Sequence, residues 1–292
     1  MRIPVLDDHI HLSPAGGNVE SVKRFERAGG THCIIVNMPY AGMEALKNRC
    51  FIPQYEETIR LCKKVNLETG VKAFAVVGPY PVELLSLAEK YGLEKAKEIM
   101  LKGIDDAAGF IKERNAIGFG EIGRPHFEVS KDILEASNEV MEYAFKTAKS
   151  LDCAVVLHTE RAKKQVYAEI VAIASNSGID KRKVVKHFAS VETISDSRGI
   201  TPSVLASREI LKPELYEKPN FMLETDFLDD FKRPGAVLDI TTVPKRVRQL
   251  IEMGIGEEKI LEIMKDLPEK VYGIEISVNA PNAPLVTQYR NE

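Results

Sequence analysis

The chain has 292 residues, of which 44% are hydrophobic and 28% are charged, and its formal net charge is −3. This composition excludes a disordered chain, and the charge excludes the global basic field that drives non-specific nucleic-acid binding. No apolar run approaches the length of a membrane span, the N-terminus lacks a signal-peptide pattern, and the four cysteines show no CxxC spacing, so we expect a cytoplasmic protein with free thiols and no membrane partner.

Short apolar runs alternate with longer amphipathic segments along the chain, which indicates a parallel sheet with helical crossovers. The expected strands are Ile3–Leu6, Cys33–Asn37, Val71–Val77, Ala116–Glu121, Cys153–His158, Val184–His187, Ile194–Ile200 and Phe221–Glu224. The expected helices are Val19–Ala28, Glu56–Glu68, Val82–Tyr91, Glu94–Glu113, Lys131–Ser150, Arg161–Ser177, Val204–Ile210, Pro244–Met253 and Glu257–Met264. This order predicts an α/β protein, a single-domain (β/α)8 TIM barrel with parallel strands and an outer ring of helices over residues 1–278, followed by a C-terminal surface tail over 279–292.

The first apolar run leads into Asp7-Asp8-His9-Ile10-His11. Side chains of a strand alternate between its two faces, so His9 and His11 point the same way, about 6 to 7 Å apart along the strand. Two imidazoles at this spacing can bind one metal ion, although such a pair also occurs in purely structural roles.

Later strands end in further potential metal ligands, at Glu121, His158, His187 and Asp226. In (β/α)8 barrels the C-terminal ends of all strands meet at one face, where the active site forms. A single histidine at a strand end is more often structural, but independent structural roles give no reason to place imidazoles and carboxylates at the same end of five strands. One shared metal centre explains all six positions: His9, His11, Glu121, His158, His187 and Asp226.

The order of these motifs resembles the TatD family of metal-dependent hydrolases, within the amidohydrolase superfamily. The matching segments are Asp7-x-His9-x-His11-Leu12, Gly118-Phe119-Gly120-Glu121-Ile122-Gly123, Val155-Val156-Leu157-His158-Thr159, His187-Phe188, Leu223-Glu224-Thr225-Asp226 and Asp266-Leu267-Pro268-Glu269-Lys270-Val271-Tyr272-Gly273. The resemblance implies two divalent metal ions bridged by Glu121, one bound by His9, His11 and Asp226 and the other by His158 and His187. The mixed nitrogen and oxygen ligands suit Zn²⁺, Mn²⁺ or Mg²⁺.

The expected reaction is hydrolysis by a metal-activated water. Glu121 and Asp226 are the predicted catalytic residues, with Asp226 accepting the proton of the water and returning it to the leaving group. Asp7 and Glu224 are candidates for supporting the ligands, although Asp7 also fits a turn cap.

Two substrate classes fit the sequence. Many TatD members are deoxyribonucleases with exonuclease character, which implies cleavage of a small phosphoester or of a nucleic-acid 3′ end, and Arg124, His126 and Arg161 are the predicted substrate contacts. The alternative is a small-molecule amidohydrolase or lactonase. It is favoured by Glu160 in front of Arg161 and by the acidic pair Asp229-Asp230, which depart from the pattern of nucleolytic members. A non-enzymatic barrel with a vestigial site is disfavoured by the complete ligand set, and the oligomeric state is left open.

Overall fold

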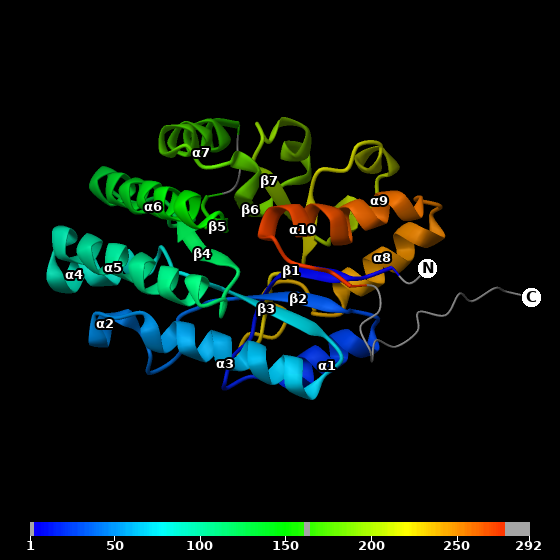
Figure 1. Cartoon of the computed structure of the whole chain (residues 1–292), viewed down its shortest axis with the longest axis horizontal. Coiled ribbons are helices and arrows are strands. Elements are labelled where there is room, and N and C mark those ends of the chain that lie inside the picture. Colours follow the sequence, from blue (N-terminus) through cyan, green and yellow to red (C-terminus); the bar gives the residue numbers. More distant parts are fainter. Residues whose placement is uncertain (1–2, 161–163, 278–292) are drawn as a thin grey trace, which may run out of the picture.

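The computed structural model describes residues 3–160 and 164–277. In these residues nine strands form one parallel sheet in the order β8-β7-β6-β5-β4-β3-β2-β1-β9. The strands are β1 (Leu6–His11), β2 (His32–Val36), β3 (Lys72–Val77), β4 (Gly118–Gly123), β5 (Ala154–His158), β6 (Val184–Ala189), β7 (Thr201–Leu205), β8 (Met222–Glu224) and β9 (Phe227–Leu228). Figure 1 shows the strands in the middle of the molecule with the helices packed around them.

Helices connect most of the successive strands. They are α1 (Val19–Arg27), α2 (Ala45–Asn48), α3 (Ile52–Glu68), α4 (Glu83–Tyr91), α5 (Leu93–Lys112), α6 (Lys131–Leu151), α7 (Lys164–Ser177), α8 (Thr242–Glu252), α9 (Glu257–Leu261) and α10 (Leu267–Tyr272). Tighter 3₁₀ turns form at Lys181–Lys183, Val191–Asp196, Arg208–Ile210 and Pro213–Tyr216, and a π-helical turn at Glu262–Asp266. Among the described residues, no helix combines the length and the apolar composition that a membrane span needs.

The two ends of the strand order come close together. β1 pairs with β2 on one side and with β9 on the other, whereas β8 pairs with β7. Only Thr225 and Asp226 separate β8 from β9. The backbone N–H and the hydroxyl of Thr225 donate hydrogen bonds of 2.9 and 2.6 Å to the carboxylate of Asp7 on β1. The segment after β8 therefore reaches from β7 to β1.

The strands are buried on both faces, as expected for a parallel sheet covered by helices. One face contributes Ile35, Phe119 and other apolar residues to a core shared with the outer helices. The other face forms a separate cluster in which Leu6 and Val156 pack with residues of α10 such as Val271. This double burial explains why most strands are recognisable as apolar runs in the sequence.

The structure confirms a parallel sheet with surrounding helices and corrects its last third. The strand expected over Ile194–Ile200 is wrong, because Val191–Asp196 forms a 3₁₀ turn and β7 follows at Thr201–Leu205. The helix expected over Val204–Ile210 is also wrong, because Val204 and Leu205 belong to β7 and Arg208–Ile210 forms a 3₁₀ turn. The physical cause is the polar start of β7, where the hydroxyl of Thr201 donates to the carbonyl of Arg182 at 2.7 Å and Ser203 is fully buried.

The start of the first strand and the number of strands also differ from the prediction. The first strand begins at Leu6 rather than Ile3 and includes His9 and His11, and the two-residue strand β9 was not predicted. The expected tail over 279–292 lies outside the described residues.

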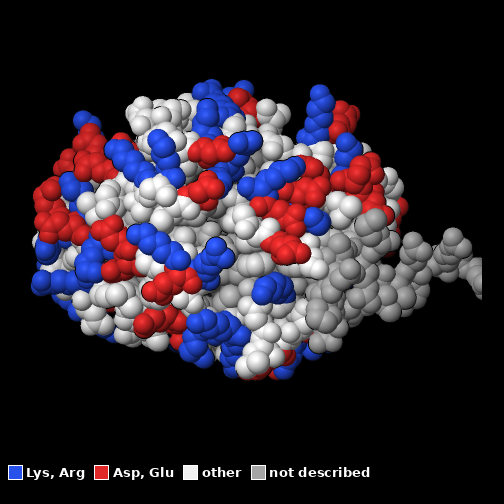
Figure 2. Space-filling view, viewed as in Figure 1, with Lys and Arg blue, Asp and Glu red and all other residues white. Residues whose placement is uncertain are grey.

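Figure 2 shows how the charged residues are distributed on one face of the molecule. Positive and negative side chains are interspersed there, without a large area of one sign. On this face nothing resembles the continuous positive surface that proteins use to track nucleic-acid backbones.

Candidate metal centre

Strand β1 places two imidazoles side by side in the interior. His9 is fully buried and His11 is 8% exposed. Their Nε2 atoms lie 3.1 Å apart, so both rings point at the same place. The pairing of β1 with β2 shifts register between Asp7 and Ile10, and this irregularity lies at the start of the HxH segment.

A buried carboxylate on β4 lies at the centre of the group. The Oε1 atom of Glu121 is 3.5 Å from His9 Nε2, 3.2 Å from His158 Nδ1 and 3.3 Å from His187 Nε2. His158 ends β5 and His187 belongs to β6, so three strands supply these contacts. One carboxylate oxygen is thus shared by three imidazoles, two of which, those of His9 and His187, stack with their ring centroids 3.9 Å apart.

Asp226 completes the group from the segment between β8 and β9. Its Oδ1 atom lies 3.5 Å from His11 Nε2 and 3.9 Å from His9 Nε2. The residue has a φ of 50°, in the left-handed region, which aspartate tolerates better than most residues. This turn points the carboxylate of Asp226 toward β1. The chain then continues as β9, which pairs with β1.

The spacing of these atoms fits divalent metal ions. Potential ligand atoms lie within 4.8 Å of one another in three groups: His9, His11 and Glu121; Glu121, His158 and His187; and His9, His187 and Glu224. Two ligands bound tetrahedrally at about 2.1 Å from one ion would lie about 3.4 Å apart. The separations of neighbouring ligand atoms, from 3.1 to 3.9 Å, lie around this value. The donor set of imidazole nitrogens and carboxylate oxygens also suits such ions.

The protonation states of two central residues favour metal binding. Burial lowers the pKa of His9 well below its ordinary value, and the neighbouring His187 lowers it further. Burial disfavours the ionised form of Glu121, but His158 and His187 outweigh this effect and hold its pKa well below the usual range. A neutral imidazole and an ionised carboxylate are the forms that coordinate metals.

Other groups hold the rings from behind. Nδ1 of His11 bonds to the carbonyl oxygen of Val36 at 3.0 Å, and Nδ1 of His187 lies 3.0 Å from Oε1 of Glu224. Partners of this kind fix the orientation of metal-binding imidazoles. The support expected from Glu224 is therefore in place, whereas the carbonyl of Val36 could not be anticipated because any residue offers one.

The predicted substrate residues have varied surroundings. Nδ1 of His126 lies 2.9 Å from Nε2 of His158, so His126 contacts the nitrogen of that ring that faces away from Glu121. Arg124 is 1% exposed and donates to Asn138 at 2.7 Å, to Glu160 at 3.2 Å and to Glu169 at 2.8 Å. Arg161 lies outside the described residues.

Asp7 and Asp229 both have roles inside the protein. Asp7 accepts the two hydrogen bonds from Thr225 and does not simply cap its own turn, and burial raises its pKa to about 8. Asp229 is 3% exposed and accepts hydrogen bonds from the backbone of Gly17 and Asn18. Its charge is directed at the N-terminal end of α1 and not toward a substrate.

Fold and site together define a metal-dependent hydrolase built on a curled parallel sheet. The family model described as "TatD related DNase" matches residues 6–273, and the chain belongs to this family. It is 37% identical over 290 residues to the uncharacterised protein MJ1127 of Methanocaldococcus jannaschii, covering 94% of this chain and 98% of that protein.

Two solved structures from Escherichia coli share the fold. The TatD homologue YjjV has a TM-score of 0.64 and 18% identity, with 94% of this chain and 100% of that chain covered. The phosphotriesterase homology protein, solved with phosphate in its active site, has a TM-score of 0.64 and 14% identity, with 93% and 99% covered. The match to the family model confirms the predicted family.

Proposed function

We propose that this protein is a two-metal phosphoesterase whose sheet closes into a single (β/α)8 barrel domain. The observation that carries the proposal is that Glu121 Oε1 lies within 3.5 Å of a ring nitrogen of each of His9, His158 and His187. One Zn²⁺, Mn²⁺ or Mg²⁺ ion would be held by His9, His11 and Asp226, the other by His158 and His187, and Glu121 would serve both.

The residues around this centre suit hydrolysis. Divalent ions bound there would lower the pKa of a water molecule and polarise a phosphoryl oxygen. Asp226, whose side chain is 14% exposed, lies at the edge of the group and is placed to accept a proton from the attacking water and pass it to the leaving group. Glu121 and His9 are almost completely buried and form the closed floor of the site.

The proposed substrate is a phosphoester, either a nucleic-acid 3′ end or a small phosphodiester. Membership of the TatD-related DNase family supports this class. Contacts from Arg124, His126 and Arg161 to the substrate stay predictions. For Arg124 such a contact requires that its guanidinium exchange Glu160 or Glu169 for a phosphate.

A small-molecule amidohydrolase or lactonase is the second candidate. It is favoured by the pairing of nearby cations with carboxylates, as Arg124 pairs with Glu160 and Glu169, and Arg233 with Asp230 at 2.9 Å.

The four cysteines are free, in keeping with the reducing cytoplasm that the sequence predicts.

Three substrate panels test the proposal on the metal-loaded protein: single-stranded DNA with a free 3′ end, bis(p-nitrophenyl) phosphate, and a set of lactones and amides. We expect phosphodiester cleavage, two bound ions per chain by elemental analysis, and a kcat about 10²- to 10⁴-fold lower in Asp226→Asn. The matched control is Asp230→Asn, which changes a neighbouring carboxylate outside the ligand set.

Two results would contradict this function. Cleavage confined to lactones or amides would establish the second candidate. A single bound ion, together with unchanged activity in Asp226→Asn, would exclude the two-metal reaction.

A further inference from the structure

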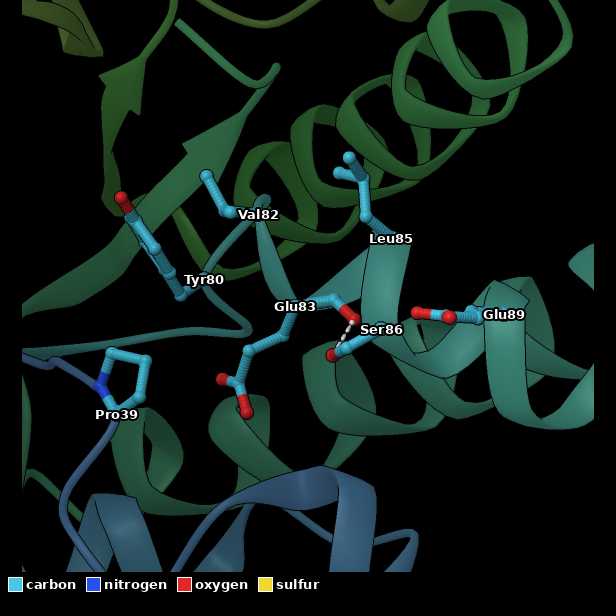
Figure 3. Close-up of a pocket in the computed structure, with 7 residues that line it drawn as sticks. All are labelled: Pro39, Tyr80, Val82, Glu83, Leu85, Ser86 and Glu89. Carbon is cyan, nitrogen blue, oxygen red and sulfur yellow. Dashed lines mark hydrogen bonds between the residues drawn. The ribbon is translucent and has the colours of Figure 1, made fainter. Parts of the chain in front are cut away.

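A cavity of about 390 Å³ lies beside the metal centre, lined by Pro39, Tyr80, Val82, Glu83, Leu85, Ser86 and Glu89 (Figure 3). We call it the Tyr80 groove. The ring of Tyr80 meets the ring of His158 edge-on, with the centroids 5.2 Å apart. The groove therefore begins at a residue of the proposed metal site. Its volume lies within the range of about 300 to 1,000 Å³ of small-molecule sites.

One wall of the groove comes from α4. Leu85, Ser86 and Glu89 recur three and four residues apart, so they lie on one face of the helix, and Val82 directly precedes it. In Figure 3 Tyr80, Val82 and Leu85 point to one side, whereas Glu83 turns to the opposite side.

The carboxylate of Glu83 is occupied elsewhere. It accepts hydrogen bonds of 3.1 Å from the backbone N–H of Ala45 and from the side-chain amide of Gln54. What remains for a ligand is the Pro39 ring, the Tyr80 ring and two aliphatic side chains, with the exposed Glu89 one helical turn beyond Leu85.

The charge of the lining excludes an anionic occupant. None of the lining residues is lysine or arginine, and Glu89 adds negative charge. A phosphate group in this groove would meet the carboxylate of Glu89 and no cation among the described lining residues, whereas an uncharged ring or alkyl chain would meet apolar surface.

We propose that the Tyr80 groove binds an uncharged, apolar ester group of the substrate while the phosphoryl group lies at the metal centre. This inference rests on the proposed function and refines it. The enzyme is then selective for small phosphodiesters carrying an aryl or alkyl group, and a polyanionic strand does not follow this path out of the site.

Phosphonates, in which a P–C bond replaces the ester bond of the group that the groove would bind, test the groove by binding. The probes are methyl methylphosphonate, methyl phenylphosphonate and methyl 4-carboxyphenylphosphonate, measured by calorimetry on the metal-loaded protein. We expect the phenyl compound to bind about tenfold more tightly than the methyl compound, as burial of a ring predicts, and the added carboxylate to abolish this gain.

Two variants change the wall of the groove. Leu85→Arg should reduce the preference for phenyl over methyl to below about threefold and improve binding of the carboxyphenyl compound. Glu89→Lys, at an exposed position that does not threaten folding, should improve binding of the carboxyphenyl compound alone. Leu67→Arg, at a residue of α3 that is 84% exposed, is the matched control and should change none of the three affinities.

The failures are distinguishable. If methyl methylphosphonate binds but the phenyl ring brings no gain, or if Leu85→Arg leaves the preference intact, the groove proposal is wrong and the metal site stands. If neither phosphonate binds, the proposed function fails and the groove proposal falls with it.

Discussion

At the scale of single residues, the site depends on contacts behind the metal-facing atoms. His11 and His187 each use one ring nitrogen toward the centre and the other toward a buried partner, whereas the second ring nitrogen of His158 contacts the exposed His126. Glu224 is the most firmly held of these partners. It is fully buried and also accepts a hydrogen bond of 2.8 Å from the backbone of Phe188. Ring orientation is therefore determined by neighbouring strands and not by the histidines alone.

The substitution Glu224→Gln tests this arrangement. It removes the negative charge beside His187 while conserving shape, and losses of such partners reduce metal affinity about 10- to 100-fold. Titration with Zn²⁺ in competition with a chromogenic chelator measures the change, and circular dichroism checks the fold. Glu214→Gln, on an exposed 3₁₀ turn, is the control. Equal affinities of wild type and Glu224→Gln would exclude an orienting role.

Glu83 gives a pH dependence of stability that is separate from the metal centre. Burial raises its pKa from 4.5 to about 7, so the folded protein holds a proton that the unfolded chain has already lost between these pH values. The contribution of this group to the free energy of unfolding is therefore at its maximum below pH 4.5 and falls by about 3 kcal/mol as the pH rises to 7.

Urea denaturation at several pH values, in wild type and in Glu83→Gln, isolates this contribution as a difference between the two proteins. We expect the advantage of wild type over Glu83→Gln to shrink as the pH rises from 4.5 to 7 and to stay constant above it. Glu89→Gln, six residues further along at an exposed position, should show no such trend. A difference that grows with pH would contradict the raised pKa.

At the scale of elements, Asp229 fastens the loop between β1 and α1. Its carboxylate accepts hydrogen bonds from the backbone of Gly17 at 2.8 Å and Asn18 at 2.7 Å, and from the hydroxyl of Ser21 at 3.0 Å. Free N–H groups and the helix dipole favour a negative charge at the start of α1. Glycine is required at position 16, because a Cβ there would lie 2.3 Å from the backbone oxygen of Asp229. The end of β9 and the start of α1 thus share one buried anion.

Asp229→Ala should destabilise the protein by about 2 to 4 kcal/mol, because several buried N–H and O–H donors lose a charged acceptor. Equilibrium unfolding in urea measures this change. Asp230→Ala, which removes only the neighbouring pair with Arg233, should have a much smaller effect. Similar stabilities of the two variants would show that the anchor at α1 contributes little.

These elements also show what the sequence could reveal. The strands that carry Glu121, His158 and His187 were predictable, because parallel strands buried on both faces are apolar and their polar ends stand out. β7 was missed because Thr201, Pro202 and Ser203 interrupt its apolar pattern, and β9 is too short to show one. The sequence did not show toward which partner a charged side chain points. Arg124 and Asp229 seemed to face a substrate, but their partners come from segments distant in sequence.

At the scale of the whole molecule, the metal centre connects parts of the chain that are far apart in sequence. Its residues come from β1, β4, β5, β6 and the segment between β8 and β9. Without a cation, buried imidazoles and carboxylates face one another in the interior. A ligand that binds only the folded state stabilises it, so metal binding should raise the stability of the entire fold.

Thermal unfolding with and without chelator measures this effect. At a free metal concentration one hundred times the dissociation constant, one site contributes about 2.7 kcal/mol, which for a chain of this size corresponds to a rise in Tm of about 4 to 5 °C. His9→Ala, at a residue that lies against both His11 and Glu121, should lose most of this rise. His32→Ala is the matched control, because His32 is as buried as His9 but bonds to Thr31. The Tm of this variant without metal should be lower than that of the wild type, while the rise on adding metal persists. A wild-type Tm that is the same in chelator and in saturating Zn²⁺, Mn²⁺ or Mg²⁺ would exclude a metal centre at these residues.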